Sequence, residues 1–181
     1  MKGIVFREYI DFVEEQTGEA VVDEMIERAD PASGAAYTAV GKYDWREMVD
    51  MVVALSEITS IPVSDLIQAF GKHLFGRLKT TYPQFLEGPR DAFEFLGTIE
   101  SKIHVEVLKL YPDAELPTLD VAETGPDSLS VKYTSCRPFG DLCIGMIEGC
   151  ANHFGEKFDI RHSTREDGLD IQIVRVLSEA A

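Results

Sequence analysis

The chain has 181 residues, an apolar fraction of 45%, and a net charge of −15 from 17 basic and 32 acidic residues. This length allows one domain with a substantial core, or two tightly joined subdomains. The negative charge repels phosphate backbones and anionic lipids, so it disfavours nucleic-acid and membrane binding but remains compatible with a basic protein partner. The sequence contains no run of about 18 apolar residues, so it predicts no transmembrane helix.

The N-terminal sequence MKGIVFREYIDFVEEQ becomes acidic too early for a secretory signal peptide. Three cysteines without such a signal indicate reduced thiols, and they lie seven residues apart at Cys136, Cys143 and Cys150. This spacing fits no compact zinc motif, so we expect ordinary buried or half-buried thiols, while a redox role of Cys136 or Cys143 stays open. The expected location is cytoplasmic.

The first half of the sequence has the spacing of helices. Apolar residues recur every three or four positions in four stretches, residues 2–16, 19–29, 45–59 and 62–83. Asp44 stands where an N-cap residue would precede the third helix, and its predicted apolar face includes Met48, Val52 and Val53. Residues 35–43 are apolar without clear periodicity, so we expect a loop or a short extended piece there.

Residues 91–112, DAFEFLGTIESKIHVEVLKLYP, predict one long helix between Gly88–Pro89 and Pro112. The core-facing stripe of this helix comprises Ala92, Leu96, Ile99, Ile103, Val107 and Leu110. His104 falls on the flank of the stripe, and Gly97, on the same row, leaves space above the imidazole for something flat or bulky. Such a histidine is either an ordinary helix residue hydrogen-bonded to a neighbour or an imidazole offered to a metal or a haem iron.

After Pro112 the apolar period changes from that of a helix to that of a strand. Residues 116–121 and 128–135 alternate around a turn, and residues 158–162 and 169–176 form a second hairpin. A helix at residues 141–154 separates the two hairpins. The sequence therefore predicts an α+β fold, in which a helical N-terminal subdomain packs on a C-terminal antiparallel sheet with β-β-α-β-β order.

The end of the second predicted strand carries a polar set. Strand alternation places Tyr133, Ser135 and Arg137 on one face. Two hydroxyls and a guanidinium suit a carboxylate or a phosphate, although alternating polar residues also form ordinary solvated faces. A haem needs such donors for its two propionates and an imidazole for its iron.

The sequence resembles the haem nitric oxide/oxygen-binding (H-NOX) family, which is related to the haem domain of soluble guanylate cyclase. The matching segments are MKGIVF at the start, AFG at 69–71, HVEVLKLYP from His104, Leu116–Pro117, Y-x-S-x-R at 133–137 and GMIEG at 145–149. They follow the family's order over essentially the whole chain. The resemblance implies a single H-NOX domain over residues 1–181, with a distal helical subdomain at 1–62, a haem-bearing subdomain at 63–181 and the haem between them.

The resemblance also implies the residues that hold the cofactor. His104 matches the proximal ligand to the iron of haem b (iron protoporphyrin IX). Tyr133, Ser135 and Arg137 match the propionate-binding set. This pairing of a helix histidine with a Y-x-S-x-R segment about thirty residues later is more specific than either feature alone.

Five apolar positions match family residues that touch the haem or the gas. Pro117 corresponds to the proline that presses on the porphyrin, and Val5 to the apolar contact from the first helix. Leu74, Leu78 and Leu142 correspond to residues that line the distal pocket.

The residue at position 142 bears on which gas is bound. Family members that bind oxygen stably carry a tyrosine at the position matching Leu142, and its hydroxyl donates to the bound oxygen. The resemblance therefore implies a nitric oxide sensor that also binds carbon monoxide and excludes oxygen. The alternative is an oxygen-binding sensor in which Tyr9, from the first helix, supplies the missing donor, although a tyrosine on that apolar face is usually a core residue.

The resemblance further implies a mechanism of signalling. Nitric oxide binding trans to His104 weakens the iron–imidazole bond until this bond breaks. The haem then relaxes against Pro117 and Val5, and the proximal helix shifts. The sequence ends at Ala181 without an output domain, so we expect a separate partner. In bacterial stand-alone members that partner is typically a histidine kinase or a cyclic-di-GMP enzyme.

Two rival classes stay open, an enzyme and a cofactor-free interaction module of the same fold. The enzyme would use His104 with Glu100 or Glu106 as a base. We expect neither glutamate on the His104 face and find no nucleophile motif, so we expect no enzyme. Some family members carry a zinc site of cysteines and histidine near the C-terminal hairpin, but residues 161–167, RHSTRED, contain no cysteine, so we expect no zinc.

Overall fold

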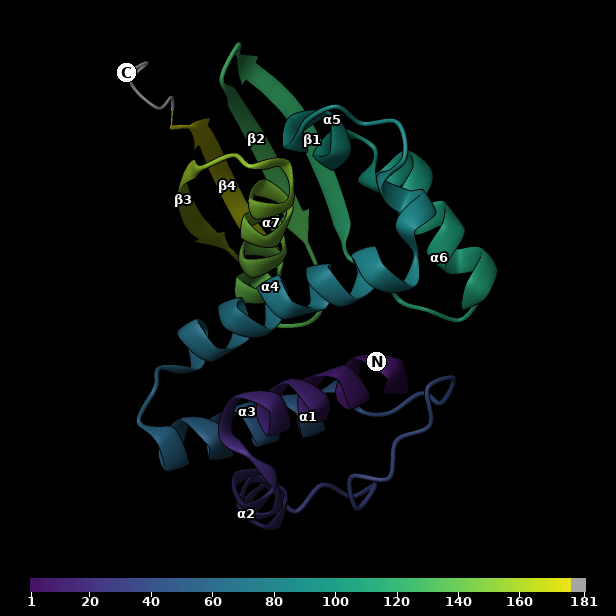
Figure 1. The fold of residues 1–181 in the computed structure, drawn as a ribbon, viewed down its shortest axis with the longest axis vertical. Helices are drawn as coiled ribbons and strands as arrows, with labels where there is room; N and C mark the ends of the chain where they lie inside the picture. The colour runs from purple at the N-terminus through teal and green to yellow at the C-terminus, as the bar shows by residue number, and fades with distance from the viewer. Residues whose placement is uncertain (177–181) are drawn as a thin grey trace. The chain divides into compact units, whose positions relative to one another are not determined.

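A computed structural model of the protein describes residues 1–176 (Figure 1). It contains two compact units, which divide between Phe70 and Gly71. This division falls inside helix α4 (Val63–Thr81), whose first residue coincides with the start of the haem-bearing subdomain expected from the sequence. The assignment of a distal and a haem-bearing subdomain remains a prediction.

The first unit contains α1 (Gly3–Thr17), α2 (Glu19–Ala29), α3 (Trp45–Thr59) and the first part of α4. The predicted N-cap of α3 is confirmed, because an Asp44 carboxylate oxygen accepts a hydrogen bond from the Arg46 amide at 3.0 Å. Residues 35–43 are turns and irregular backbone, apart from one isolated bridge between Lys42 and Lys2. The expectation of a loop there is also confirmed.

The core of the first unit is rich in aromatic side chains. Phe6 stacks on Tyr37 with ring centroids 4.3 Å apart, and Tyr9 contacts Phe70 edge-on at 5.1 Å. The predicted apolar face of α3 is partly wrong, because Val53 is 41% exposed. The buried residues of α3 are Met48, Met51, Val52, Ala54 and Leu55, and most of them follow the i, i+3, i+4, i+7 spacing of a single stripe, which excludes Val53.

The second unit contains a four-stranded antiparallel sheet in the order β1-β2-β4-β3. The strands are β1 (Thr118–Gly125), β2 (Ser128–Thr134), β3 (Phe158–Arg165) and β4 (Gly168–Arg175). Helix α7 (Gly140–Phe154) connects β2 to β3 and lies against one face of the sheet (Figure 1). The predicted α+β class and its β-β-α-β-β order are therefore confirmed.

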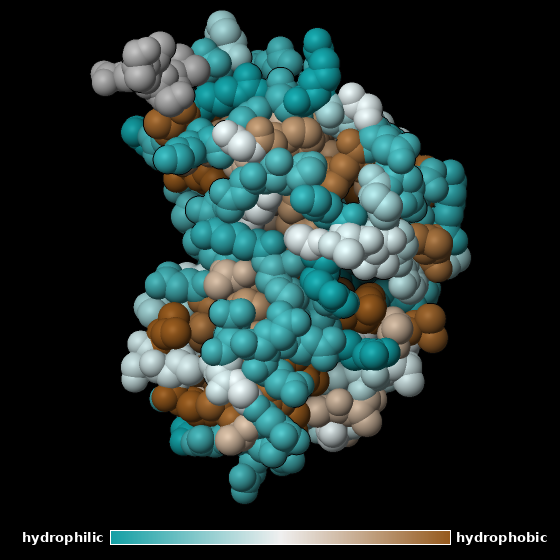
Figure 2. Space-filling model, viewed as in Figure 1, coloured by the Kyte–Doolittle hydropathy of each residue, from teal (hydrophilic) through white to brown (hydrophobic). Residues whose placement is uncertain are grey.

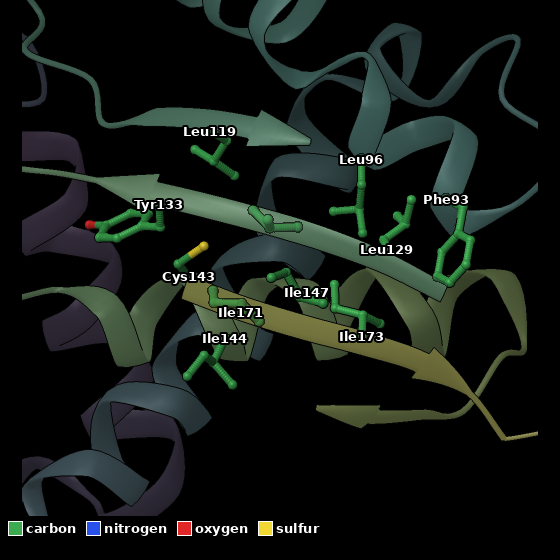
Figure 3. Close-up of a cluster of buried hydrophobic side chains, with 11 residues drawn as sticks. Phe93, Leu96, Leu119, Leu129, Tyr133, Cys143, Ile144, Ile147, Ile171 and Ile173 are labelled. Atoms are coloured by element: carbon green, nitrogen blue, oxygen red, sulfur yellow. The ribbon is translucent and has the colours of Figure 1, made fainter. Parts of the chain in front are cut away.

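Strand alternation builds the core between the sheet and α7. Leu129, Val131 and Tyr133 of β2 point inward together with Ile171 and Ile173 of β4. Figure 3 shows these side chains facing those of α7, with the Tyr133 ring at one end of the cluster. The core thus continues directly into the segment that carries the predicted polar set.

Helices α4 and α7 meet through glycines. A Cβ on Gly71 would lie 2.5 Å from the Leu142 carbonyl oxygen, and one on Gly149 would lie 2.9 Å from Cβ of Phe75. Both distances are shorter than real Cβ contacts, so a larger residue would force the two helices apart. The contact at Gly71 fixes the start of α7, where Leu142 lies, against α4.

The segment 91–112 is not the single α-helix that its sequence predicts. It comprises α5 (Ala92–Gly97), a π-helical turn η2 (Ile99–Ile103) and α6 (His104–Leu110). A short 3₁₀ helix, η1 (Pro83–Leu86), precedes it. A π turn holds more residues than an α turn, so residues on either side of η2 do not share the helical rows that an unbroken helix would give them.

The predicted core stripe of this segment is correct through the π turn, where Ile99 and Ile103 pack against the core, but not to the end of α6. Ala92 and Leu96 are buried, whereas Leu110 is 53% exposed. Neither η2 nor α6 buries a residue fully. The row shared by Gly97 and His104 was also derived from an unbroken helix, so that part of the prediction is wrong, although a Cβ on Gly97 would meet no atom within 4 Å.

Within residues 1–176, no helix has both the length and the apolar composition needed to cross a membrane. Figure 2 shows hydrophilic residues over much of the visible face, with hydrophobic residues in small groups between them. This distribution agrees with the large number of charged residues in the sequence.

Candidate functional site

His104 begins α6, and its side chain is 16% exposed. Its Nδ1 atom lies 3.1 Å from the Glu100 Oε1 atom, and the same oxygen accepts the Leu119 amide hydrogen bond at 2.7 Å. Glu100 therefore links the imidazole to the first residues of β1. The Nε2 atom of His104 has no hydrogen-bond partner among residues 1–176, so it is the nitrogen available to a ligand.

The expectation that neither glutamate lies on the His104 face is wrong for Glu100. Residues four apart on a helix are neighbours, and this spacing was a signal that predicted the contact. Glu106 instead accepts a hydrogen bond from the Lys109 ammonium at 2.6 Å. A carboxylate on the far nitrogen of an imidazole is a common way of orienting a histidine that binds a metal.

Burial lowers the pKa of His104 below its usual value, and the neighbouring Glu100 carboxylate only partly opposes this effect. The imidazole is therefore favoured in its neutral form. The neutral ring is the form that binds a metal, because the coordinating nitrogen must carry a free electron pair.

Tyr133, Ser135 and Arg137 lie together, but a turn rather than strand alternation joins them. Strand β2 ends at Thr134, so Ser135 and Arg137 lie beyond the ladder. The Ser135 hydroxyl accepts the Arg137 amide hydrogen bond at 3.1 Å, and the nearby Ser135 side chain partly opposes the effect of burial on the pKa of Tyr133. Burial raises the pKa of Tyr133, so its hydroxyl stays protonated and able to donate.

The Arg137 guanidinium has one buried N–H donor without a hydrogen-bond partner among the described residues. Its side chain is only 10% exposed, Nη1 donates to the Glu115 carbonyl oxygen at 3.0 Å, and Nη2 pairs with the Glu115 carboxylate. The Nε atom is buried without a hydrogen-bond partner among the described residues. A buried, unpaired donor of this kind costs about 1–3 kcal/mol or more, so the group fits a further anionic acceptor such as a propionate.

The apolar candidate positions lie on three helices and in the connection before β1. Pro117 is half-buried directly before β1, two residues from the Leu119 amide that Glu100 binds. Leu74 of α4 is buried, while Leu78 of α4 and Leu142 of α7 are half-buried. Val5, in α1 of the first unit, is half-buried.

Tyr9 of α1 is fully buried, as a core residue should be. Its hydroxyl nevertheless has no hydrogen-bond partner among residues 1–176. Burial raises the pKa of this hydroxyl strongly, so it is protonated at any physiological pH. The Tyr9 hydroxyl is therefore a buried hydrogen-bond donor in the first unit that has no acceptor among the described residues.

All three cysteines are free thiols. Cys143 and Cys150 are buried as expected, whereas Cys136 is exposed, because it follows the end of β2. Burial raises the pKa of Cys143 to about 12, which makes it inert at neutral pH. In the part of the chain that the structure describes, no group of three or more histidine, cysteine or acidic side chains is arranged to hold a metal ion, and the expectation of no zinc stays a prediction.

Sequence reasoning missed three partners of the site residues, Glu100, Glu115 and Arg165. Only Glu100 had a signal in the sequence, its spacing of four from His104. Glu115 lies 22 residues from Arg137, and Arg165 lies 32 residues from Tyr133. Their contacts depend on how the hairpins fold and cannot be read from local periodicity.

The fold and these side chains define a class of protein. It is an α+β protein with a neutral, carboxylate-oriented imidazole and a separate hydroxyl–guanidinium set, a combination suited to an anionic cofactor that contains a metal.

Comparison with known families gives the same class in finer detail. The family model for haem-NO-binding domains matches residues 2–162. The chain therefore belongs to the haem-NO-binding (H-NOX) family, whose domains bind haem and serve as gas sensors.

Solved H-NOX structures have the same fold over the full length of the chain. An unliganded Fe(II) H-NOX protein from K. algicida is 35% identical, with a TM-score of 0.92 and 100% of both chains covered. An H-NOX protein from S. oneidensis in the Fe(II)NO state is 28% identical, with a TM-score of 0.89 over 98% of this chain and 100% of that one. The IWP-051-bound H-NOX from Shewanella woodyi in the Fe(II)CO state is 37% identical, with a TM-score of 0.83 over 100% and 97%. No protein with a curated description gave a significant match to the sequence.

Proposed function

We propose that this protein is a cytoplasmic sensor that binds nitric oxide and carbon monoxide at ferrous haem b, excludes oxygen, and passes the signal to a separate partner protein. The observation that carries the proposal is the His104 side chain, neutral and oriented through Nδ1, with Nε2 free for a ligand. The haem iron supplies the position at which a diatomic gas binds. This chain's residues orient the cofactor, select the gas and transmit the change.

Each group of side chains has a defined part in holding the haem. His104 would ligate the iron through Nε2 while Glu100 holds the ring. Tyr133, Ser135 and the Nε atom of Arg137 would donate to the propionates. Pro117 and Val5 would contact the porphyrin, and Leu74, Leu78 and Leu142 would line the gas-binding side.

The proposed gas selectivity depends on what the distal residues lack. Leu74, Leu78 and Leu142 have no hydrogen-bond donors in their side chains. Bound oxygen acquires partial negative charge and needs a donor, whereas nitric oxide and carbon monoxide bind ferrous haem without one. The nitric oxide and carbon monoxide states of the S. oneidensis and S. woodyi proteins support the choice of these two ligands.

The proposed signal is carried by α6. Ile99 and Ile103 of the π turn pack against the core, whereas α6 has no fully buried residue, so few core contacts hold α6 itself. Ligation of His104 would tether the start of α6, and loss of that tether would free it to shift. A partner responds only if it binds one of the two positions more tightly. A histidine kinase or a cyclic-di-GMP enzyme is the partner that we propose.

Replacement of His104 by glycine tests the central role. We expect His104→Gly to retain haem poorly, and added imidazole to restore haem binding because it replaces the lost ligand. Absorption spectra and the rate of haem transfer to an acceptor apoprotein measure both effects. Glu106→Gln is a matched control, since Glu106 lies on the same helix and, among the residues that the structure describes, pairs only with Lys109. Tight haem binding by His104→Gly without imidazole would contradict the proposal.

A second candidate function is an oxygen-binding sensor, and the unpartnered Tyr9 hydroxyl favours it. If this hydroxyl donates to a bound gas, the wild-type protein forms a stable oxygen complex that Tyr9→Phe abolishes. Under the nitric oxide proposal neither protein forms one. In that case Tyr9→Phe gains about 1 kcal/mol of stability, because a buried unpaired hydroxyl is removed. Thermal unfolding and absorption in air distinguish the two.

A further inference from the structure

The turn between β3 and β4 contacts the end of β2, directly before the Tyr133–Arg137 segment. The Ser135 amide donates to the Asp167 carbonyl oxygen at 3.0 Å, which extends the contact one residue beyond the ladder. Within the ladder, Tyr133 pairs with Leu169 and Thr134 pairs with Gly168. The turn therefore meets three consecutive residues of the segment.

Arg165, the last residue of β3, forms the centre of this contact. Its Nη2 atom donates to the Tyr133 carbonyl oxygen and to the Thr134 hydroxyl, both at 3.1 Å. Asp167 and Asp170 each place a carboxylate oxygen 3.2 Å from the same guanidinium, whose side chain is 21% exposed. The two aspartates form ion pairs with the guanidinium and offset its charge.

Gly168 allows the turn to approach the strand. A Cβ at this position would lie 1.9 Å from the Tyr133 carbonyl oxygen, and its φ of +156° is one that L side chains rarely adopt. The backbone of the turn is therefore as close to Tyr133 as it can be. Arg165 and Gly168 together hold the main chain at Tyr133 and Thr134, directly before Ser135.

We propose that Arg165, supported by Asp167 and Asp170, is a positioning residue for the Tyr133–Ser135–Arg137 anion site. The inference rests on the proposed function, because it assumes that this site binds the haem propionates. Strand ends normally fray, and a site just past one needs an external support to keep its donors within hydrogen-bonding distance of the ligand. Arg165 supplies this support through its bonds to Tyr133 and Thr134.

The test compares Arg165→Gln with Arg161→Gln in the haem-loaded protein. Arg161 lies on the same strand, is 80% exposed and, within residues 1–176, pairs only with Asp159, so its replacement makes the same charge change without touching β2. We expect Arg165→Gln to speed haem transfer to an acceptor apoprotein about tenfold. A rate change of this size corresponds to the free energy of one charge-assisted hydrogen bond. Arg165→Lys should fall between it and the wild type, because lysine keeps the charge but loses the fork.

Two further readouts separate positioning from general stability. Hydrogen exchange of the Ser135 amide should accelerate in Arg165→Gln while that of Val131, in the middle of β2, stays unchanged. The effects of Arg165→Gln and Arg137→Gln on haem transfer should also be non-additive, because one residue acts through the other. If Arg165→Gln fails to fold, Asp170→Asn tests the same support with the arginine in place.

Equal haem transfer rates for Arg165→Gln and Arg161→Gln, or additive effects with Arg137→Gln, would overturn the inference. In that case a clear effect of Arg137→Gln alone leaves the proposed function intact. No effect of Arg137→Gln or Tyr133→Phe on haem transfer would contradict the proposed propionate site itself. The two failures are therefore distinguishable.

Discussion

Glu100 shows how one side chain connects the parts of the candidate site. One carboxylate oxygen lies 3.1 Å from the His104 Nδ1 atom and accepts a hydrogen bond from the Leu119 amide. The first partner begins α6 and the second lies in β1, two residues after Pro117. Any displacement of the imidazole would therefore change a hydrogen bond to the segment that carries Pro117.

Replacing this carboxylate by an amide should weaken the hold on the imidazole. We expect Glu100→Gln to lower the iron–histidine stretching frequency, because a neutral acceptor makes the ring a weaker donor to iron. Haem loss should accelerate about tenfold. Resonance Raman spectra of the ferrous protein and haem transfer kinetics measure these effects. Glu106→Gln is the control, and an unchanged stretching frequency in Glu100→Gln would show that the pair does not tune the ligand.

At the residue scale, the sequence proposes the side chains of the candidate site but does not predict most of the partners that the structure gives them. Tyr133, Ser135 and Arg137 lie together as predicted, because they are close in sequence whichever way the chain turns. The strand geometry assumed for them is wrong, since Ser135 bonds to the β3–β4 turn instead of continuing the ladder. Glu115 and Arg165 come from distant segments, so only the folded hairpins bring them to the site.

At the scale of secondary structure, glycines set the packing of α4 against α7. A Cβ on Gly149 would lie 2.9 Å from Phe75 and 3.2 Å from the Lys72 carbonyl oxygen, whereas one on Gly76 would meet nothing within 4 Å. Gly149→Ala should therefore destabilise the fold by about 1–3 kcal/mol. Gly76→Ala, on the partner helix, should stabilise it by about 1 kcal/mol, because alanine favours a helix over glycine. Chemical denaturation measures both, and equal effects would contradict the packing described.

The helices and strands follow from local patterns, with one exception. Periods of three to four and of two predict the elements and their order, because each element buries one face. The π turn before His104 was not predicted, since nothing in the periodicity of residues 91–112 requires an extra residue in that turn. This turn separates α5, which has four buried residues, from α6, which has none. Such a junction is where a shift of α6 would begin.

At the scale of the whole molecule, net charge opposes compactness. With 32 acidic and 17 basic residues, like charges repel over distances longer than a single ion pair. Salt screens this repulsion, because the Debye length falls from about 30 Å at 0.01 M to about 10 Å at 0.1 M. The melting temperature should therefore rise between these concentrations, equally in NaCl and KCl. A fall would mean that local ion pairs outweigh the net repulsion.

The central claim is that His104 holds a haem iron whose opposite side accepts nitric oxide but not oxygen. The absorption spectrum of the purified ferrous protein, recorded alone, in air and with nitric oxide, tests it most directly. We predict a haem band that does not change in air and that shifts with nitric oxide to the spectrum of a five-coordinate nitrosyl haem, in which His104 has been released. A stable oxygen complex would contradict the selectivity assigned to Leu142, and failure to bind haem would contradict the sensor function as a whole.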